Sequence, residues 1–429
     1  MTGGTASRPR FRSRLGALPR NVWAVTLTSF LTDVSSEMLF PLLPLFLSNV
    51  LGAKTGVVGV VEGVAETTAS LLKVISGRLS DRVGRRKGLA VGGYVVSTLA
   101  KPLLLVARVW GAVLGIRFIE RLGKGLRTAP RDALIADSIE PAQRGLAFGL
   151  HRAGDTAGAV VGLGVAFGVV SALERDALAL TRPVFRTLIL LSLIPAVLGV
   201  AVLALLAREA PRPRPPAGDP RPDGTGSGTG IGPDRRFATF LLIMIVFTLG
   251  NSSDAFLVLR AQASGLSVRG VLGMLISFNL VYTLASVPAG LLSDRLGRRG
   301  VIVAGWAVYA AIYLGFARAS AGWQAWALMT AYGAFYALTE GVAKAYVADL
   351  VPADRRGHAY GLFNAAIGLT ALPASVIAGV LWQGVGDWPG LGPGAPFYFG
   401  AGMALCACAL LVLAIPEQHP PPDPREAEL

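Results

Sequence analysis

The sequence predicts an all-α membrane protein whose twelve transmembrane helices form two pseudo-symmetric six-helix bundles. Composition, the lengths of the apolar runs and an internal repeat support this fold class. The chain of 429 residues is 53% hydrophobic and only 15% charged, whereas a soluble domain is about 25% charged. Its apolar residues gather in runs of about 20 residues, the length of helix that crosses a bilayer. These features exclude an ordinary soluble domain.

Apolar runs bounded by charged residues, glycine or proline mark the expected helices in order. The first six are expected near 22–48, 56–77, 88–107, 110–135, 145–171 and 184–207. The second six are expected near 237–259, 268–291, 299–317, 322–348, 358–383 and 396–415. The stretch between the two sets is rich in proline, glycine and charge and offers nothing to bury. The predicted organisation is an N-terminal bundle (1–207), a flexible cytoplasmic linker (208–236), a C-terminal bundle (237–415) and a cytoplasmic tail (416–429).

The net charge of +14 is explained by topology rather than by nucleic-acid binding. Most lysine and arginine residues fall in segments on one side of the expected membrane, and such an excess marks the cytoplasmic side. We therefore expect a multi-pass protein of the inner (plasma) membrane with both termini in the cytoplasm. The basic segments are the N-terminal tail, 78–87, the linker, 295–299 and 355–356.

The two halves repeat each other in sequence. GRLSDRVGRRK at 77–87 recurs as GLLSDRLGRRG at 290–300, and RGLAFGL at 144–150 recurs as RGHAYGL at 356–362. The two matches have nearly the same offset, which is hard to obtain by chance. Since each half holds an even number of spans, the halves should have parallel orientation and be related by an axis along the membrane normal.

The pattern Gly-x-x-x-Asp-Arg-x-Gly-Arg-Arg after the second and eighth spans resembles the loop signature of the major facilitator superfamily. The resemblance implies the fold of that family, with a central cavity between two bundles that work by alternating access. It also implies that these loops latch the bundles on the cytoplasmic side while the cavity faces outward. The carboxylates can reach a helix N-terminus or an arginine of the other bundle. The expected gating residues are Gly77, Asp81, Arg82, Gly290, Asp294 and Arg295.

Charged residues inside the expected spans should face the protein interior and pair, because charge is expensive in hydrocarbon. Asp33 and Glu37 are four residues apart and so share one helical face. At about 1.5 Å per residue, Asp33 lies roughly 18 Å from the start of its span, near the bilayer centre. The second span carries an acidic stripe and the fourth a basic stripe, which can neutralise each other. The expected proton-coupling residues are Asp33, Glu37, Glu62, Glu66, Arg117 and Asp155.

The C-terminal half has fewer intramembrane charges and is expected to supply an aromatic wall. Its charged residues are Asp254 and the four-apart pair Glu340 and Lys344. An alternative is that the buried charges are static ion pairs that only hold helices together. The expected substrate-binding residues are Asp33, Arg117, Arg121, Asn251, Asp254, Asn279, Tyr282, Tyr336 and Asn364.

Two further patterns resemble those of the same family. Arg117 and Gly123 match its fourth-span pattern and imply a proton relay by the arginine, although Glu120 and Arg121 replace the usual Gln-Gly. The segment 154–162 is similar to the fifth-span pattern of antiporters, except that alanine stands at 159 where the pattern has proline. Its glycines, four residues apart, equally predict close helix packing.

The expected function is proton-coupled secondary active transport, in which a small amphipathic compound or metabolite is exported by H⁺ antiport. One alternative is uptake of an anionic or zwitterionic solute by proton symport, and another is a non-transporting receptor or lipid-handling protein. We expect that the protein is not an enzyme, because the sequence shows no nucleophile, base and orienting group that could form a catalytic site. No phosphate-binding loop or metal motif occurs, so no cofactor is expected. The expected partners are a small solute, protons and the lipid bilayer, with no nucleic acid, for a protein acting as a monomer.

Overall fold

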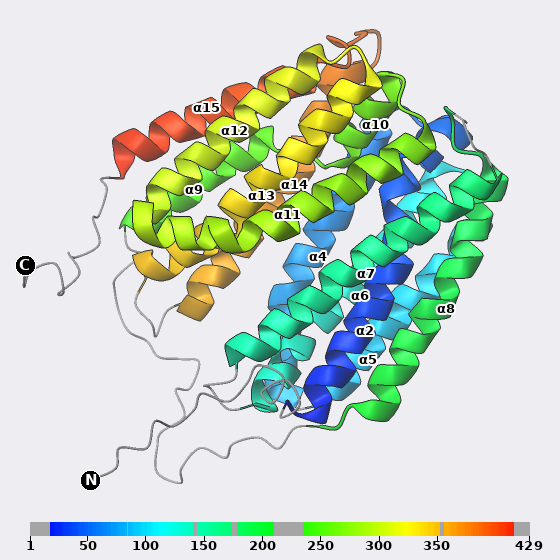
Figure 1. Cartoon of the computed structure of the whole chain (residues 1–429), viewed down its shortest axis with the longest axis vertical. Helices are drawn as coiled ribbons and strands as arrows, with labels where there is room; N and C mark the ends of the chain where they lie inside the picture. The colour runs from blue at the N-terminus through cyan, green and yellow to red at the C-terminus, as the bar shows by residue number, and fades with distance from the viewer. Residues whose placement is uncertain are drawn as a thin grey trace, which may run out of the picture.

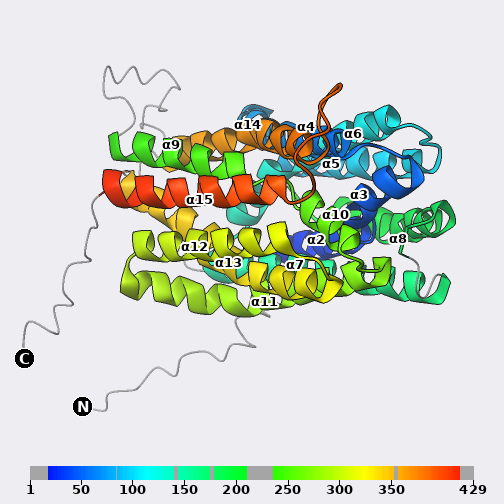
Figure 2. The ribbon, with the colours of Figure 1, turned by 90° about the horizontal axis from the view of Figure 1, so that it is seen from above.

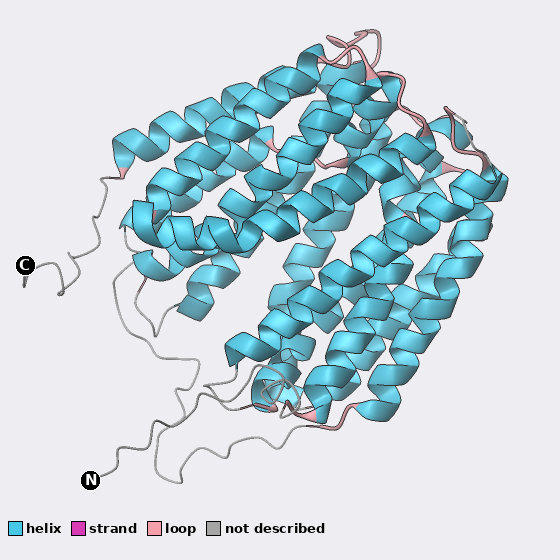
Figure 3. Cartoon of the chain, in the orientation of Figure 1, coloured by secondary structure: helices cyan, strands magenta, loops and turns pink. Residues whose placement is uncertain are grey.

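The computed structural model describes residues 18–83, 85–139, 144–173, 178–209, 235–351 and 356–415. Nearly all of them are helical (Figure 3). The helices form two groups, α2 to α8 and α9 to α15, which we call the first and second halves (Figure 1). The elements fill all twelve expected spans, so the predicted all-α membrane fold is confirmed. The domain boundaries stay a prediction, because 210–234 and 416–429 lie outside the described residues.

The first half begins with a span that is broken after one long helix. Helix α2 (Arg20–Glu37) is followed by the short turns η1 (Phe40–Leu42), α3 (Leu43–Leu45) and η2 (Phe46–Val50). Pro41 and Pro44 lie in these turns, where each lacks the N–H that a regular helix needs. The remaining elements are α4 (Thr55–Val83), α5 (Arg86–Ala100) with η3 (Lys101–Leu105), α6 (Trp110–Asp137), α7 (Arg144–Leu173) and α8 (Arg182–Leu206).

The second half also begins with a broken span. Helix α9 (Arg235–Gly250) and helix α10 (Ala255–Ala263) are separated by the short segment 251–254. Both halves are therefore interrupted in their first span, as their repeated sequences lead one to expect. The remaining elements are α11 (Val268–Leu296), α12 (Arg298–Arg318), α13 (Gly322–Leu350), α14 (Arg356–Gln383) and α15 (Ala395–Ala414).

Nine spans are long and apolar enough to cross a membrane by composition alone, counted over the described part of the chain. The three that fall short are α4, α6 and α13. They carry most of the charged side chains predicted to lie inside the membrane. Such helices remain stable in a bilayer when their charges face other helices or a water-filled space. The charged faces of these three helices should therefore point toward the interior of the protein.

The two halves meet mainly through α4 with α14 and α7 with α11. In Figure 2, α14 and α4 are neighbours along one edge of the molecule, and α11 lies along the opposite edge, toward which α7 is placed. Glycine permits the close approach of α4 and α14, since a Cβ on Gly59 would lie 2.4 Å from the carbonyl oxygen of Ser375. Within the first half, a Cβ on Gly158 of α7 would lie 2.4 Å from the carbonyl oxygen of Phe30 in α2. The close packing predicted for the 154–162 glycines is thus confirmed.

Candidate functional site

A central cavity of about 550 Å³ lies between the two halves. The first half contributes α2 with η1 and α3, α4, α6 and α7, and the second contributes α9, the 251–254 segment, α10, α11, α13 and α14. Its volume falls within the range of ligand sites, roughly 300–1,000 Å³. The charged residues that line it are Glu37, Glu62, Glu66, Arg117, Arg121 and Asp254.

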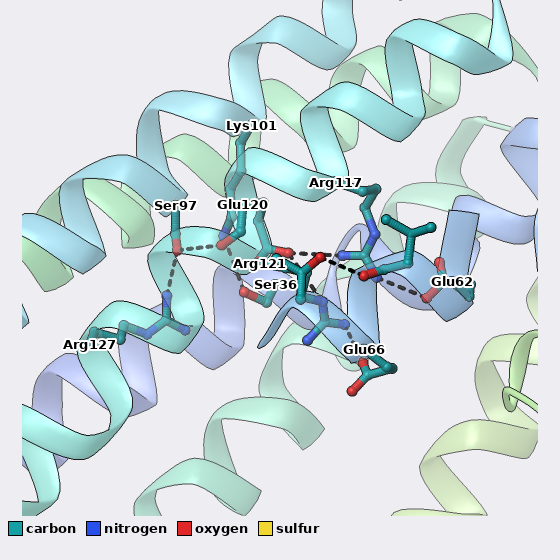
Figure 4. A network of polar contacts seen from close by, with 11 residues as sticks. Ser36, Glu62, Glu66, Ser97, Lys101, Arg117, Glu120, Arg121 and Arg127 are labelled. Carbon is teal, nitrogen blue, oxygen red and sulfur yellow. Dashed lines mark hydrogen bonds and ion pairs between the residues drawn. The ribbon is translucent and has the colours of Figure 1, made fainter. Parts of the chain in front are cut away.

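One wall of the central cavity is an ion-pair network between α4 and α6 (Figure 4). Arg117 donates from Nη2 to Glu62 Oε2 at 2.9 Å and from Nη1 to Glu120 Oε2 at 3.0 Å. Arg121 lies 3.0 Å from Glu66 and 3.4 Å from Glu120. The acidic pair and the basic pair each have a four-residue spacing, so both arginines meet a carboxylate across the helix interface. The predicted pairing of second-span and fourth-span charges is confirmed.

The buried side of this network continues into α5 and η3. Arg127 donates to Ser97 Oγ at 2.8 Å, and its guanidinium lies 4.4 Å from the centre of the Tyr94 ring. The Lys101 side chain, in a residue only 2% exposed, donates to the hydroxyls of Ser35 and Ser36. Sequence reasoning missed Lys101, although a single lysine inside the apolar run 88–107 was the available signal.

On the opposite wall, Asp254 accepts hydrogen bonds from two tyrosines of α13. Tyr332 and Tyr336 each donate a hydroxyl over 3.3 Å. Tyr336 also packs edge-on against Phe278, with ring centres 5.4 Å apart. The carboxylate sits in the break between α9 and α10, where the chain can turn it toward the cavity. The expected aromatic wall in the second half is therefore present.

Most of the predicted substrate-binding residues line the central cavity, and three do not. Arg117, Arg121, Asn251, Asp254, Asn279 and Tyr336 are part of the lining. Asn364 is instead exposed and donates to the carbonyl oxygen of Tyr360 one turn earlier. Asp33 lies one helical turn before Glu37, which does reach the cavity because α2 ends there.

Tyr282 belongs to a polar bridge between the halves rather than to the cavity lining. Its hydroxyl accepts from Arg152 Nη2 of α7 at 3.1 Å and donates to Glu340 Oε2 of α13 at 2.5 Å. Lys344 completes the bridge with a 3.2 Å ion pair to Glu340, which confirms that predicted pair. The bridge links α7 of the first half to α11 and α13 of the second.

Asp155 of α7 lies near both α2 and the bridge. It is within electrostatic reach of Asp33, and His151 Nε2 is 3.7 Å from Asp155 Oδ2. Asp33 is also within reach of Glu37, Lys124 and Arg127. The carboxylates of α2 and α7 therefore form a group that extends from the cavity toward the ends where both helices begin.

Of the expected gating residues, Gly77, Asp81 and Arg82 lie near the end of α4, and Gly290, Asp294 and Arg295 lie near the end of α11. The surroundings are described for Gly77. A Cβ on it would meet the Ala129 Cβ of α6 at an ordinary 3.6 Å. The side chains or surroundings of Asp81, Arg82, Gly290, Asp294 and Arg295 lie outside the described part of the structure. Within the described part, no group of three or more His, Cys, Asp or Glu residues is placed to hold a metal ion.

Comparison with known proteins shows which protein family this chain is similar to. The sequence profile of the Major Facilitator Superfamily matches residues 25–278 and 237–428. The chain is 36% identical to an uncharacterized MFS-type transporter of Methanocaldococcus jannaschii, over 92% of this chain and 95% of that protein. It is 32% identical to the multidrug resistance protein MdtH of Aeromonas hydrophila, over 33% of this chain and 35% of that protein. The crystal structure of a D-xylose-proton symporter superimposes with a TM-score of 0.70 at 16% identity and covers 93% of this chain and 98% of its own.

Proposed function

Because the chain belongs to the major facilitator superfamily and is a multi-pass membrane transporter, we propose that it exports a small amphipathic compound or metabolite by H⁺ antiport. The central cavity carries this proposal, since ionisable side chains from both halves line one space. A solute held there touches both halves, so rocking of one half against the other would expose it to alternate sides of the membrane. The proposed setting is the inner membrane, with cytoplasmic termini and a monomeric protein.

The proposed substrate-binding residues are those that line the cavity, and the carboxylates of α2 and α7 are proposed to carry the proton. Glu37 faces the solute, while Asp33 and Asp155 lie behind it toward the beginnings of their helices. Burial favours the neutral form of a carboxyl group, and a nearby cation favours the charged form. A change in water access or in solute occupancy can therefore bind or release a proton.

In this scheme the α4–α6 network has a supporting part. The sequence also predicts Glu62, Glu66 and Arg117 as proton-coupling residues. Because they are held in ion pairs, we propose for them the alternative role of static pairs that hold α4 against α6. The latch residues Gly77, Asp81, Arg82, Gly290, Asp294 and Arg295 retain the proposed role of closing the cytoplasmic side.

Two similar proteins bear on the direction of transport and on its coupling to protons. The name of the Aeromonas relative favours export, and that relative matches a third of this chain. The similarity in fold to a D-xylose-proton symporter favours proton coupling. Uptake by symport is the second candidate, and the two differ in the sign of proton movement.

Liposomes loaded with a pH-sensitive dye test the proposal. Purified protein is reconstituted, and a panel of organic cations, organic anions and neutral metabolites is added outside. Antiport predicts that solute entry makes the lumen alkaline, because protons leave. Symport predicts acidification. Solute entry that leaves the lumen pH unchanged would refute proton coupling.

The role of Asp33 is tested by Asp33→Asn in the same liposomes. The variant should move solute with a strongly reduced pH change. The matched control is Asp349→Asn at the end of α13, where the carboxylate is half exposed and pairs with Arg298. Undiminished proton movement in Asp33→Asn would remove Asp33 from the coupling role.

A further inference from the structure

The cationic side chains that line the central cavity are already neutralised. Arg117 is 1% exposed, and both ends of its guanidinium contact carboxylates, one on Glu62 and one on Glu120. Arg121 is likewise held between Glu66 and Glu120. An anionic solute at either arginine would compete with the carboxylates already paired with it. Displacing Glu62 from Arg117 would leave that carboxylate unpaired in a buried position. The arginines are therefore poor anchors for an anion.

Two carboxylates in the cavity lining lack such partners. Among the described residues, Glu37 and Asp254 form no ion pair, and the bonds to Asp254 come from two neutral tyrosine hydroxyls. The cations within electrostatic reach of Glu37 are Lys124, Arg121, Lys101 and Arg117. The two lysines do not line the cavity, and the two arginines are held in ion pairs with other carboxylates. The lining thus holds four carboxylates against two arginines. Its excess charge is negative.

These two carboxylates occupy equivalent places in the two halves. Glu37 ends α2 just before the break in the first span, and Asp254 lies in the break between α9 and α10. Paired interruptions of this kind in transporter repeats mark the substrate site. A positive charge between Glu37 and Asp254 would be attracted by both halves at once.

The remaining lining suits an organic rather than a simple inorganic cation. Phe40, Phe278 and Tyr336 present aromatic rings to the cavity, and the face of such a ring attracts cations. The guanidinium of Arg117 already lies 4.2 Å from the centre of the Phe40 ring. Apolar side chains such as Leu163 and Val258 lie on other parts of the wall. Rings and apolar side chains would pack against a hydrophobic body.

We infer that the transported solute is an amphipathic organic cation whose positive charge is held between Glu37 and Asp254. This inference rests on the proposed function, because it names the substrate class of the same cavity. It excludes the anionic solute expected for the symport alternative.

Two ions of nearly the same size and opposite charge, tetraphenylphosphonium and tetraphenylborate, test the inference. Binding to purified full-length protein in detergent is measured by calorimetry and by the shift of its melting temperature. Tetraphenylphosphonium should bind and raise the melting temperature, and tetraphenylborate should bind at least tenfold more weakly. Equal binding, preference for the borate, or binding of neither ion would overturn the inference.

Variants identify the anchoring carboxylates. Glu37→Gln and Asp254→Asn should each weaken tetraphenylphosphonium binding at least tenfold, whereas Asp349→Asn should leave it unchanged. Should a neutral variant fail to fold, Glu37→Asp or Asp254→Glu, which keep the charge, should retain most of the affinity. Wild-type affinity in both neutral variants would contradict the inference. It would also be contradicted if a folded charge-keeping variant lost as much affinity as the neutral variant at the same position.

Failure of the inference and failure of the proposed function can be told apart. Binding in detergent needs neither a membrane nor a proton gradient. If the protein binds the cation but moves no protons in liposomes, the proposed proton coupling is refuted and the inferred substrate class still stands. If it transports an anion together with protons, the proton coupling stands and the inferred substrate class is refuted.

Discussion

Arg117→Met should destabilise the protein much more than Glu62→Gln does, although the two residues are partners. The reason is the unequal number of charges around them. Arg117 contacts two carboxylates, so it keeps Glu120 when Glu62 is replaced. Glu62 has a single ion-pair partner among the described residues, and loss of that partner leaves its carboxylate unpaired in a nearly buried position.

The magnitudes follow from this geometry. Glu62→Gln removes one charge-assisted hydrogen bond and should cost about 1.5–3 kcal/mol. Arg117→Met leaves an uncompensated buried charge and should cost about 3–5 kcal/mol. At about 2–4 °C per kcal/mol for larger domains, the two melting temperatures should differ by several degrees. The double variant should be more stable than the sum of the two single effects implies, because it removes both charges.

Thermal unfolding of the purified variants, followed by tryptophan fluorescence in one detergent, measures these differences. Arg121→Met is a useful companion, since Glu66 is half exposed and its unpaired carboxylate keeps contact with water. Arg121→Met should therefore lower the free energy of unfolding by less than Arg117→Met does. A Glu62→Gln variant as unstable as Arg117→Met, or strict additivity in the double variant, would refute the reasoning.

Three further predictions concern packing, the bridge and the missed lysine. Gly158→Ala should cost about 1–3 kcal/mol by overpacking α7 against α2, whereas Gly164→Ala, which meets nothing within 4 Å, should be close to neutral in the same melting assay. Tyr282→Phe should change stability by less than about 1 kcal/mol, because Arg152 in the bridge is 60% exposed. The same variant should speed backbone hydrogen exchange in α7 and α11, since the bridge that joins these helices is broken. Unchanged exchange would argue against a bridge that restrains the two helices. Lys101→Met should leave the melting temperature nearly unchanged and tighten tetraphenylphosphonium binding severalfold, since a positive charge near Glu37 is removed; weaker binding would contradict this.

Pairing between α4 and α6 could be predicted because it follows from local periodicity. Glu62 and Glu66 are four residues apart, as are Arg117 and Arg121, so each pair lies on one face whatever the surrounding packing. Opposite stripes of charge in hydrocarbon have few stable alternatives to meeting each other.

Assignment of the cavity residues could not be made in the same way. The depth of Asp33 in its span predicts it as a proton-coupling and substrate-binding residue, whereas Glu37 is predicted for proton coupling alone. The structure places Glu37 in the lining instead, since α2 ends at that residue and the chain turns through Pro41 and Pro44. Similarly, Tyr282 joins the bridge because the register of α7 against α11 brings Arg152 to its hydroxyl.

The sequence by itself determined the membrane class, the twelve spans and the relation between the halves. These follow from the length of apolar runs and from repeated motifs, which are properties of neighbouring residues. Only the tertiary structure decided which carboxylates have cationic partners and which face the cavity alone. That distinction depends on distances between side chains on different helices, and such distances are set by how far and at what angle the helices pack.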